Sequence, residues 1–182
     1  MSIAAVILAA GFSRRLGRPK QTLLLGGETL VERAARIALE AGLSPIFVVV
    51  NRDAEFCDSL EQHGYLVVMN ELAAEGMASS IRRGVKAAET FRASGVMLMT
   101  CDQIELKADH LRQLAQNPAQ ITASSYAGRK GIPAYFPASA FSALLLLQGD
   151  VGARDLLRPA QAILNESLAV DIDTEADAAN LS

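Results

Sequence analysis

Aromatic side chains, cysteine and histidine are all scarce in this chain. Of its 182 residues, 5% are aromatic, none is tryptophan, two are cysteine and two are histidine. Cys57 and Cys101 lack metal-type spacing and suit a reducing cytoplasm, which is where we expect the protein to be located. Two histidines cannot form a histidine-rich metal site, so we expect His63 and His110 to be surface residues of helices.

The sequence also lacks a long apolar run and an excess of positive charge. The apolar run Ile3–Ala10 is far shorter than the roughly 20 residues that span a bilayer. Cations follow this run, whereas the cations of a signal peptide precede its apolar segment. The net charge is −3 and the basic residues gather in one loop, which argues against a nucleic-acid binder. We therefore expect neither a membrane nor a nucleic acid as a partner.

Acidic residues are absent from positions 1–27, yet four cations fall between Arg14 and Lys20. Glycines in this segment would let the backbone approach a ligand closely. Backbone N–H groups beside Arg and Lys form a concavity suited to phosphate oxygens. We interpret the segment as a phosphate-binding loop, with a solvated basic turn as the alternative. Its residues are Gly11, Ser13, Arg14, Arg15, Gly17, Arg18 and Lys20.

Two familiar nucleotide-binding patterns are missing. Gly11 is not followed by the G-K-[ST] end of a P-loop, which argues against a P-loop ATPase. No G-x-G-x-x-G follows the first apolar run, and no acid stands about 20 residues further on. A dinucleotide-binding oxidoreductase is therefore weakly supported.

Patterns of buried strands and of helices alternate along the chain, which predicts an α/β protein with a parallel sheet. A hydrophobic share of 51% without a repeat or linker predicts one domain spanning residues 1–182. We expect a Rossmann-like, mostly parallel sheet with helices on both faces. The predicted strands cover 3–8, 46–50, 65–69, 95–100, 121–126, 132–136 and 168–172, and the predicted helices cover 29–41, 53–63, 79–93, 107–116 and 141–147.

Some local features can be predicted within these elements. Glu32 and Arg36 are spaced to pair on the exposed side of the first helix. Pro133 suggests that its strand lies at an edge or begins there. Thr174 with Asp177 resembles a capping box that starts a terminal helix.

Three acids are candidate metal ligands. Asp102 follows the strand 95–100, at the end of a strand where open α/β sheets bind their ligands. Its carboxylate would suit Mg²⁺, which takes one or two carboxylates plus substrate phosphates, whereas a helix cap or an Asx-turn is the alternative. Asp171 and Asp173 alternate on the predicted last strand and would face one side. One of them could be a second ligand, although Asp173 could equally assist the start of the terminal helix.

Two further segments allow both a structural and a functional interpretation. Ser79 and Ser80 stand where a helix begins, so one of them could be a cap or both could contact a ligand. Residues 148–154 form a second glycine-bearing turn, which could be a simple turn with an Asp150–Arg154 ion pair. The residues alone leave both choices open.

The segment LAAGFSRRLGRPK resembles the L-A-[AG]-G-x-S-x-R-[ML]-G-x-x-K signature of sugar-phosphate and cofactor nucleotidyltransferases. More narrowly, the chain resembles the molybdenum cofactor cytidylyltransferases and their MobA-like relatives. The supporting motifs follow in order as Asn70 with EGMASSIRRG, then CDQ, GIPAYF, GDVGAR and DIDT. The resemblance spans almost the whole chain, and GDVGAR makes it specific. Ile104 departs from the usual proline, which predicts a looser turn, and Leu16 replaces methionine.

By this resemblance, the loop from Ala9 to Gly17 wraps a triphosphate, and Asp102 holds Mg²⁺ or Mn²⁺ with Asp171 or Asp173. The implied catalytic residues are Arg15, Lys20 and Asp102. The implied nucleotide-binding residues are Leu8, Ala9, Ala10, Gly11, Ser13, Arg14, Arg15, Gly17, Lys20, Asn70, Gly76, Ser79 and Ser80. The implied acceptor-binding residues are Gln103, Gly131, Pro133, Gly149, Asp150, Gly152, Ala153 and Arg154.

The resemblance implies transfer of CMP from CTP to the terminal phosphate of molybdopterin or the molybdenum cofactor, with release of pyrophosphate. GTP-using relatives tend to carry LAGG, so LAAG favours CTP over GTP. One alternative is a nucleotidyltransferase that uses GTP or another small phosphate acceptor. An alternative of another class is a non-catalytic protein that binds the molybdenum cofactor. A client molybdoenzyme or its chaperone is a further expected partner.

Overall fold

The structure, a computed structural model, describes residues 2–13, 16–150, 152–172 and 175–179. Seven of the described strands form one sheet in the order β5-β4-β1-β6-β8-β7-β9. All strand pairs of this sheet are parallel except the two that β8 makes with β6 and β7. The mostly parallel α/β sheet predicted from the sequence is therefore confirmed. The strands are β1 (Ile3–Leu8), β4 (Ile46–Val50), β5 (Leu66–Met69), β6 (Gly95–Met99), β7 (Thr122–Tyr126), β8 (Arg129–Pro137) and β9 (Gln161–Leu164).

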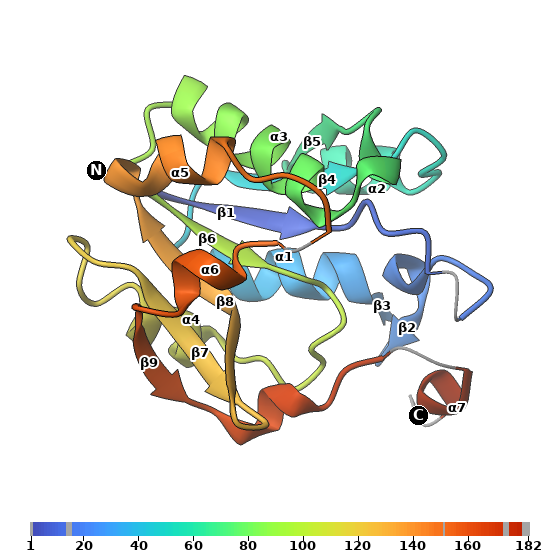
Figure 1. Cartoon of the computed structure of the whole chain (residues 1–182). Coiled ribbons are helices and arrows are strands. Elements are labelled where there is room, and N and C mark those ends of the chain that lie inside the picture. Colours follow the sequence, from blue (N-terminus) through green and yellow to red (C-terminus); the bar gives the residue numbers. More distant parts are fainter. Residues whose placement is uncertain (1, 14–15, 151, 173–174, 180–182) are drawn as a thin grey trace.

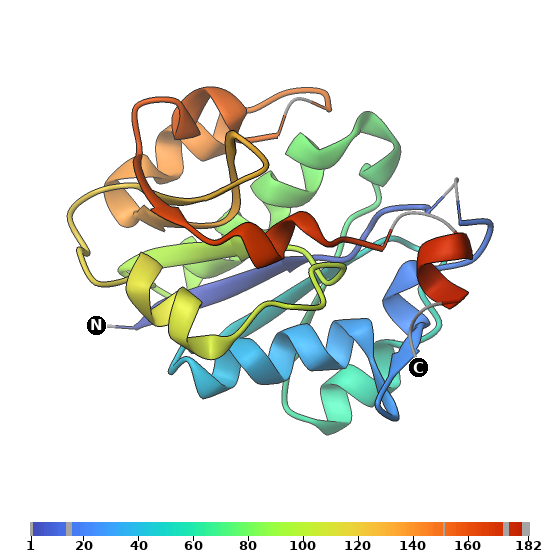
Figure 2. The ribbon, with the colours of Figure 1, turned by 90° about the horizontal axis from the view of Figure 1, so that it is seen from below.

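Helices cover both faces of this sheet (Figure 1). Ala5 and Ile7 of β1 belong to one core, whereas Ala4 and Val6 belong to the other, because successive side chains of a strand point to opposite faces. The first core is shared with α1 (Leu30–Glu40), α2 (Cys57–Gln62) and α4 (Ala108–Leu114), which Figure 2 shows from below. The second is shared with α3 (Met77–Thr90), α5 (Phe141–Leu145) and α6 (Arg154–Leu157).

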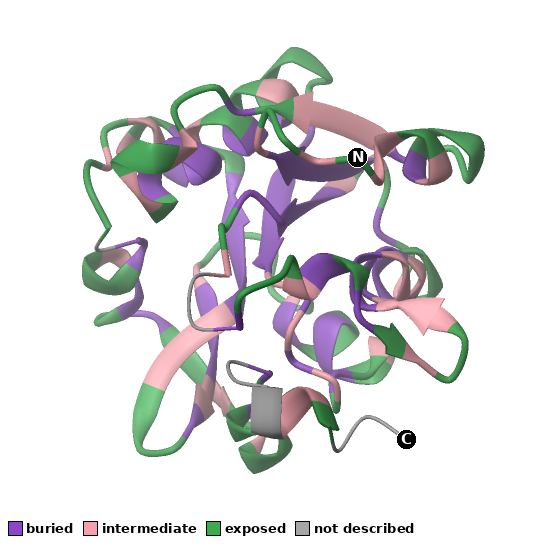
Figure 3. Cartoon of the chain, turned by 90° about the vertical axis from the view of Figure 1, so that its right-hand side faces the viewer, coloured by how far each residue is buried: buried purple, intermediate pink, exposed green. Residues whose placement is uncertain are grey.

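The central strands are completely enclosed by these helices. Every residue of β4 and β6 is buried, and the buried strands run through the middle of the molecule in Figure 3. Gly84 lets α3 approach β1 closely, since a methyl group at Gly84 would collide with Val6. This close packing brings the start of α3 near the end of β1. No helix among the described residues is long and apolar enough to cross a membrane.

Short elements complete the described chain. A hairpin of β2 (Leu24–Leu25) and β3 (Glu28–Thr29) turns through two glycines. The terminal helix α7 (Glu175–Ala179) lies beside this hairpin in Figures 1 and 2. The 3₁₀ helices are η1 (Lys20–Thr22), η2 (Ala73–Glu75), η3 (Ala138–Ala140) and η4 (Glu166–Ala169).

The predicted last strand at 168–172 is wrong. Residues 166–169 form η4, and the strand lies earlier, as β9 on the edge next to β7. Leu168 and Ile172 are buried in the core, which explains the apolar signal, but Leu168 lies in η4 and the residues up to Ile172 pair with no strand. Asp171 therefore does not lie on a strand, and Asp173 and Thr174 are outside the described residues.

Pro133 lies within β8, not at an edge strand or at the strand's start as predicted. The register between β7 and β8 shifts between Ala123 and Ser124, which pair with Ala134 and Gly131 respectively. This shift leaves Ile132 and Pro133 without partners on β7, so proline removes no ladder hydrogen bond there.

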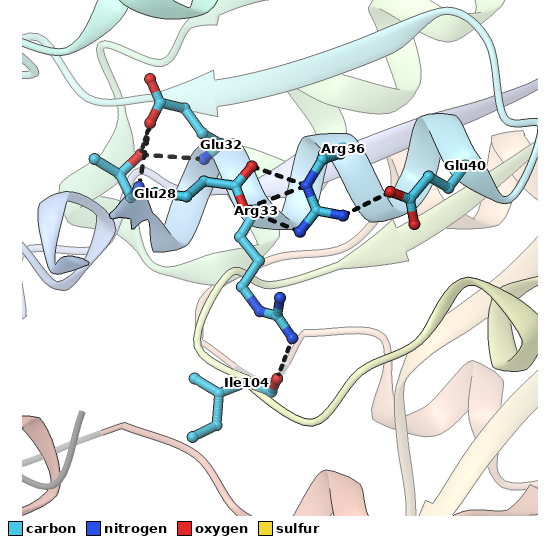
Figure 4. A network of polar contacts seen from close by, with 7 residues as sticks. Glu28, Glu32, Arg33, Arg36, Glu40 and Ile104 are labelled. Carbon is cyan, nitrogen blue, oxygen red and sulfur yellow. Dashed lines mark hydrogen bonds and ion pairs between the residues drawn. The ribbon is translucent and has the colours of Figure 1, made fainter. Parts of the chain in front are cut away.

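The predicted Glu32–Arg36 ion pair is absent from the hydrogen bonds and ion pairs of α1 (Figure 4). Arg36 instead pairs with Glu28 at 2.9 Å and with Glu40 at 2.6 Å. Glu32 is the third residue of α1 and forms a capping box with Thr29, the N-cap residue. The backbone N–H of Glu32 donates to the Thr29 hydroxyl, and the backbone N–H of Thr29 donates to the Glu32 carboxylate. Hydroxyl groups of Ser59 and Thr29 lower the pKa of the Glu32 carboxyl. The Glu32 carboxylate therefore caps the start of α1 and does not pair with Arg36, although the helical spacing would allow that pair.

Candidate active site

A cavity of about 450 Å³ opens where the order of the sheet strands reverses. The chain passes from β1 outward to β4 and β5, then returns to β6 on the other side of β1. The carboxyl ends of β1 and β6 meet at this cavity, and the sequence places its basic loop after β1 and Asp102 after β6. The lining residues are Leu8, Ala10, Gly11, Phe12, Lys20, Gln21, Ala73, Ala74, Glu75, Gly76, Met77, Ser80, Thr100, Cys101, Asp102 and Asp150.

The loop after β1 folds back on itself. The Ser13 hydroxyl accepts the backbone N–H of Lys20 at 3.0 Å, and the Ser13 carbonyl accepts that of Gly17 at 3.1 Å. Leu16 is buried and anchors the loop in the core. Gly17 has a φ of 75°, in the left-handed region that favours glycine. Arg14 and Arg15 lie outside the described residues, so their predicted phosphate contacts remain predictions.

Lys20 and Asp102 form an ion pair across the cavity. Lys20 Nζ lies 2.6 Å from Asp102 Oδ2, and the two side chains are only 19% and 15% exposed. Lys20 Nζ also donates to the carbonyl of Ile172 at 3.2 Å. Three distant segments of the sequence thus meet at one ammonium group. Both residues were predicted as catalytic, and the structure brings them together.

Neither the neighbouring cysteine nor the buried histidine offers a nucleophile or base at this cavity. Burial raises the pKa of the Cys101 thiol to about 12, so the thiol stays protonated near neutral pH. His110, predicted to be a surface residue, is instead buried, and its Nε2 lies 2.8 Å from Ser124 Oγ. His63 is exposed, as predicted.

The start of α3 contacts the GDVGAR segment. Ala78 N donates to the carbonyl of Gly149 at 3.1 Å, and Met77 N donates to Asp150 Oδ1 at 3.2 Å. A Cβ atom on Gly76 would stand 2.8 Å from the carbonyl oxygen of Gly149, so no side chain fits there. Gly149 and Asp150, which we assigned to the acceptor, therefore adjoin the same helix start as Gly76, and Asp150 lines the same cavity.

The side chain of Asn70 supports the start of α3 through hydrogen bonds. Its Nδ2 donates to Ser79 Oγ at 2.9 Å and to Ser80 Oγ at 3.0 Å, and its Oδ1 accepts from Leu72 N. Ser79 donates in turn to the carbonyl of Gly76. Ser80 lines the cavity, whereas Asn70 and Ser79 are 1% exposed and support the residues that line it.

Three of the other acceptor candidates lie on the β8 side of Asp102, namely Gln103, Gly131 and Pro133. Gln103 Nε2 donates to the carbonyls of Ile132 at 3.1 Å and Leu168 at 3.4 Å. The Tyr126 hydroxyl donates to the same Ile132 carbonyl at 2.9 Å. A Cβ on Gly131 would stand 2.6 Å from that hydroxyl. Packing against Tyr126 therefore explains why this position is a glycine.

Gly152, Ala153 and Arg154 lead into α6. Gly152 has a φ of 61° and a Cβ there would stand 3.0 Å from Met77 Sδ, which ties this turn to the start of α3. Ala153 is buried, whereas Arg154 is exposed. Arg154 lines a separate hollow of about 450 Å³ together with Lys130, Asp155 and Arg158.

Among the described residues, no group of three Asp, Glu, His or Cys side chains could hold a metal ion. Asp171 is exposed, and Asp173 lies outside the described residues. Asp102 still fits a metal that the substrate helps to bind, because Mg²⁺ commonly takes one or two carboxylates plus substrate phosphates. The Lys20 ammonium already shows that this carboxylate accommodates a cation.

Fold and site together define an α/β nucleotidyltransferase of the kind expected from the sequence. A model of the MobA-like NTP transferase domain matches residues 5–166, and the chain belongs to this family.

Curated relatives carry several different names. "Purine catabolism protein PucB" of Bacillus subtilis (strain 168) is 33% identical over 168 residues, covering 87% of this chain and 82% of that protein. "Nicotine blue oxidoreductase" of Paenarthrobacter nicotinovorans is 31% identical over 190 residues, covering 94% and 92%. A "probable molybdenum cofactor guanylyltransferase" of Opitutus terrae is 33% identical over 107 residues, but covers 59% of this chain and 51% of that protein.

Solved structures agree with the fold. Rv0371c from Mycobacterium tuberculosis H37Rv superposes with a TM-score of 0.80 at 28% identity, covering 100% of this chain and 98% of that one. Rv0371c in complex with manganese superposes with a TM-score of 0.78 at 26% identity, with the same coverage.

Gln21 is a residue of the site that no motif in the sequence predicts. Gln21 is 3% exposed and lies beside the cavity, where its amide contacts the loop after β1. The phosphate-loop signature ends at Lys20, and a polar residue after it carries no pattern of its own. Only its burial in the folded chain identifies it.

Proposed function

We propose that this nucleotidyltransferase moves CMP from CTP to the terminal phosphate of molybdopterin or the molybdenum cofactor. The proposal is supported chiefly by the Lys20–Asp102 pair at the strand-order reversal, beside a glycine-bearing loop and a cavity of about 450 Å³. A cation and a carboxylate next to such a loop suit a triphosphate and its divalent metal. In this proposal, residues 1–182 form one catalytic domain.

The reaction needs no nucleophile from the protein. An oxygen of the acceptor's terminal phosphate attacks the α-phosphorus of CTP, and the bond from this phosphorus to the bridging oxygen breaks. Pyrophosphate leaves with the bonding electrons. Because the acceptor phosphate is already ionised, no side chain has to remove a proton. Positioning and charge neutralisation then provide most of the acceleration, as in phosphoryl transfer generally.

Lys20 and Asp102 would have distinct roles in this reaction. Lys20 Nζ would bind phosphate oxygens of CTP together with Arg15. Asp102 would hold Mg²⁺, with Mn²⁺ as an alternative, and Asp171 or Asp173 would assist it. When bound, the metal would neutralise charge on the triphosphate. The manganese complex of Rv0371c, a relative at 26% identity, supports the use of a divalent metal.

The choice of CTP depends on Ala10 in LAAG, where GTP-using relatives tend to carry the first glycine of LAGG. GTP is the second candidate, because a relative named as a molybdenum cofactor guanylyltransferase is 33% identical over 107 residues. A reductase is a candidate of another class, because the relative named nicotine blue oxidoreductase covers 94% of this chain.

Pyrophosphate release separates these candidates. Purified protein with Mg²⁺ receives CTP, GTP, ATP or UTP, with molybdopterin or its molybdenum form as acceptor. We expect acceptor-dependent release with CTP alone. Release with GTP would keep the reaction and change the nucleotide. No release with any nucleotide, from folded protein and intact acceptor, would contradict the proposal and favour a cofactor-binding protein. Oxidation of NADH or NADPH with a dye substrate would favour the reductase instead.

A further inference from the structure

Gln21 holds the loop after β1 by two backbone contacts. Its Nε2 donates to the carbonyl of Ala9 at 2.8 Å and to the carbonyl of Gly11 at 2.9 Å. Both hydrogens of one amide group are therefore used on the residues that flank Ala10. The side chain is 3% exposed, so these contacts lie inside the protein and not in water.

Neighbouring contacts complete this restraint. Asn51 Nδ2 donates to the carbonyl of Ala10 at 3.2 Å, so three successive carbonyls are bound by side-chain amides. Lys20 N closes the loop onto Ser13 Oγ. The partly negative carbonyl oxygens of Ala9 and Gly11 are thereby bound to amide hydrogens instead of facing an anionic ligand. This arrangement favours a loop that receives phosphate oxygens.

Gln21 keeps these contacts at an energetic cost. Its Oε1 is buried and has no hydrogen-bond partner among the described residues. A buried carbonyl without a partner destabilises a protein, and such groups in a folded chain call for an explanation. A leucine or methionine of similar size would avoid this oxygen, but it could not bind the two carbonyls. The amide nitrogen is thus the part of the side chain that the site requires.

We propose that Gln21 is a positioning residue that holds Ala9–Gly11 in the shape that binds the triphosphate. This role rests on the proposed function of the loop as a nucleotide site. Lys20 would bind the phosphates through its positive charge, and Gln21 would hold the backbone that surrounds them. Gln21 acts through the backbone and does not itself touch the nucleotide.

The test compares binding with stability in Gln21→Leu. Calorimetry at low temperature measures the affinity of the folded protein for Mg²⁺ with CTP and for Mg²⁺ with inorganic tripolyphosphate. We expect both affinities to fall about 10- to 100-fold, because a small displacement of a binding loop has effects of this size. We expect the Tm to fall as well, because the carbonyls of Ala9 and Gly11 lose their amide donors. A purely structural role would also lower the Tm but would leave the affinity of the folded protein unchanged.

Two further variants make the result decisive. Gln21→Met repeats the test with a more flexible side chain, and Gln113→Leu makes the same chemical change at an exposed position of α4. Wild-type affinity in both Gln21 variants would overturn the role, as would failure of both to fold. If the wild-type protein binds neither ligand, the proposed function itself fails, and the role fails with it. Gln113→Leu should match the wild-type protein in both measurements.

Discussion

At the residue scale, Lys20 and Asp102 carry most of the proposed chemistry, because their opposite charges meet at 2.6 Å inside the cavity. We predict that Lys20→Met and Asp102→Asn each reduce kcat/KM about 10²- to 10³-fold, the usual effect of removing one electrostatic contact to a transition state. Asp102→Asn should also raise the Mg²⁺ concentration needed for half-maximal rate. Initial rates across a Mg²⁺ series measure both effects.

The matched controls for these substitutions are Lys107→Met and Asp109→Asn, which change residues of the same kinds outside the cavity. Both should retain wild-type rates and Mg²⁺ dependence. Full activity in a folded Asp102→Asn variant would refute the assignment of Asp102 as the metal-holding carboxylate.

His110 makes the stability of the fold depend on pH. Ser124 Oγ donates to the carbonyl of Pro133 at 2.6 Å, so its hydrogen is used and His110 Nε2 donates to Ser124. Burial lowers the pKa of His110 below its ordinary value of 6.5. As pH falls through about 6.5, the unfolded chain binds a proton that the folded chain does not, so the free energy of unfolding decreases.

Urea denaturation between about pH 7.5 and 5.5 measures this effect, above the range where most carboxylates titrate. We predict a smaller free energy of unfolding at the lower pH, and a weaker pH dependence in His110→Gln. If the free energy of unfolding changes equally with pH in His110→Gln and in the wild-type protein, His110 does not cause the pH dependence.

At the scale of elements, the start of α3 and the segment after α5 form one unit. Gly149 and Asp150 accept from backbone N–H groups of α3, and Arg82 donates to the carbonyl of Leu147 at 2.7 Å. We predict that Gly76→Ala separates them, because its Cβ would meet the Gly149 backbone at 2.8 Å and its φ of 111° disfavours a side chain. Its Tm and its affinity for CTP should both fall.

Gly11→Ala is the informative comparison for Gly76→Ala. Apart from its two chain neighbours, no described residue has an atom within 4 Å of the position that a Cβ on Gly11 would occupy, so the Tm should be unchanged. If a nucleotide approaches this backbone closely, the CTP affinity should fall all the same. A Gly76→Ala variant with wild-type Tm and affinity would contradict the proposed coupling.

Helix α1 supports the loop that carries Asp102. Arg33 Nη2 donates to the carbonyl of Ile104 at 2.7 Å (Figure 4). Ile104 also packs against the core, so this turn has a tether where relatives have proline. We predict that Arg33→Met lowers kcat about 10²-fold or less with little change in the KM for CTP, since a displaced catalytic group slows chemistry. Arg112→Met, at an exposed arginine of α4, serves as the control. An unchanged kcat in Arg33→Met would show that the tether is dispensable.

At the scale of the whole molecule, the sequence predicts the architecture best where a single physical cause dominates. The predicted strands at 3–8, 46–50 and 95–100 match observed strands within one residue at each end, because enclosed parallel strands are continuous apolar runs. The strand predicted at 65–69 matches equally well, although β5 is a partly exposed edge strand. Gly11, Lys20 and Asp102 come together because strand ends meet at the reversal of strand order.

Predictions failed where tertiary contacts decide the outcome. Leu168 and Ile172 gave the signal of a strand but are core residues of an irregular segment. Glu32 was available to Arg36 by spacing alone, yet it caps its own helix. Burial of Gln21 and His110 depends on elements distant in the sequence, so no local pattern could reveal it.

The most direct test of the account follows the α-phosphorus of the nucleotide. CTP labelled at this position is incubated with the protein, Mg²⁺ and the molybdenum cofactor, and the products are separated. We predict that the label appears in the pterin product in a one-to-one ratio with released pyrophosphate. Asp102→Asn should nearly abolish this transfer. Label that stays in CTP, from folded protein with intact acceptor, would contradict the proposed function.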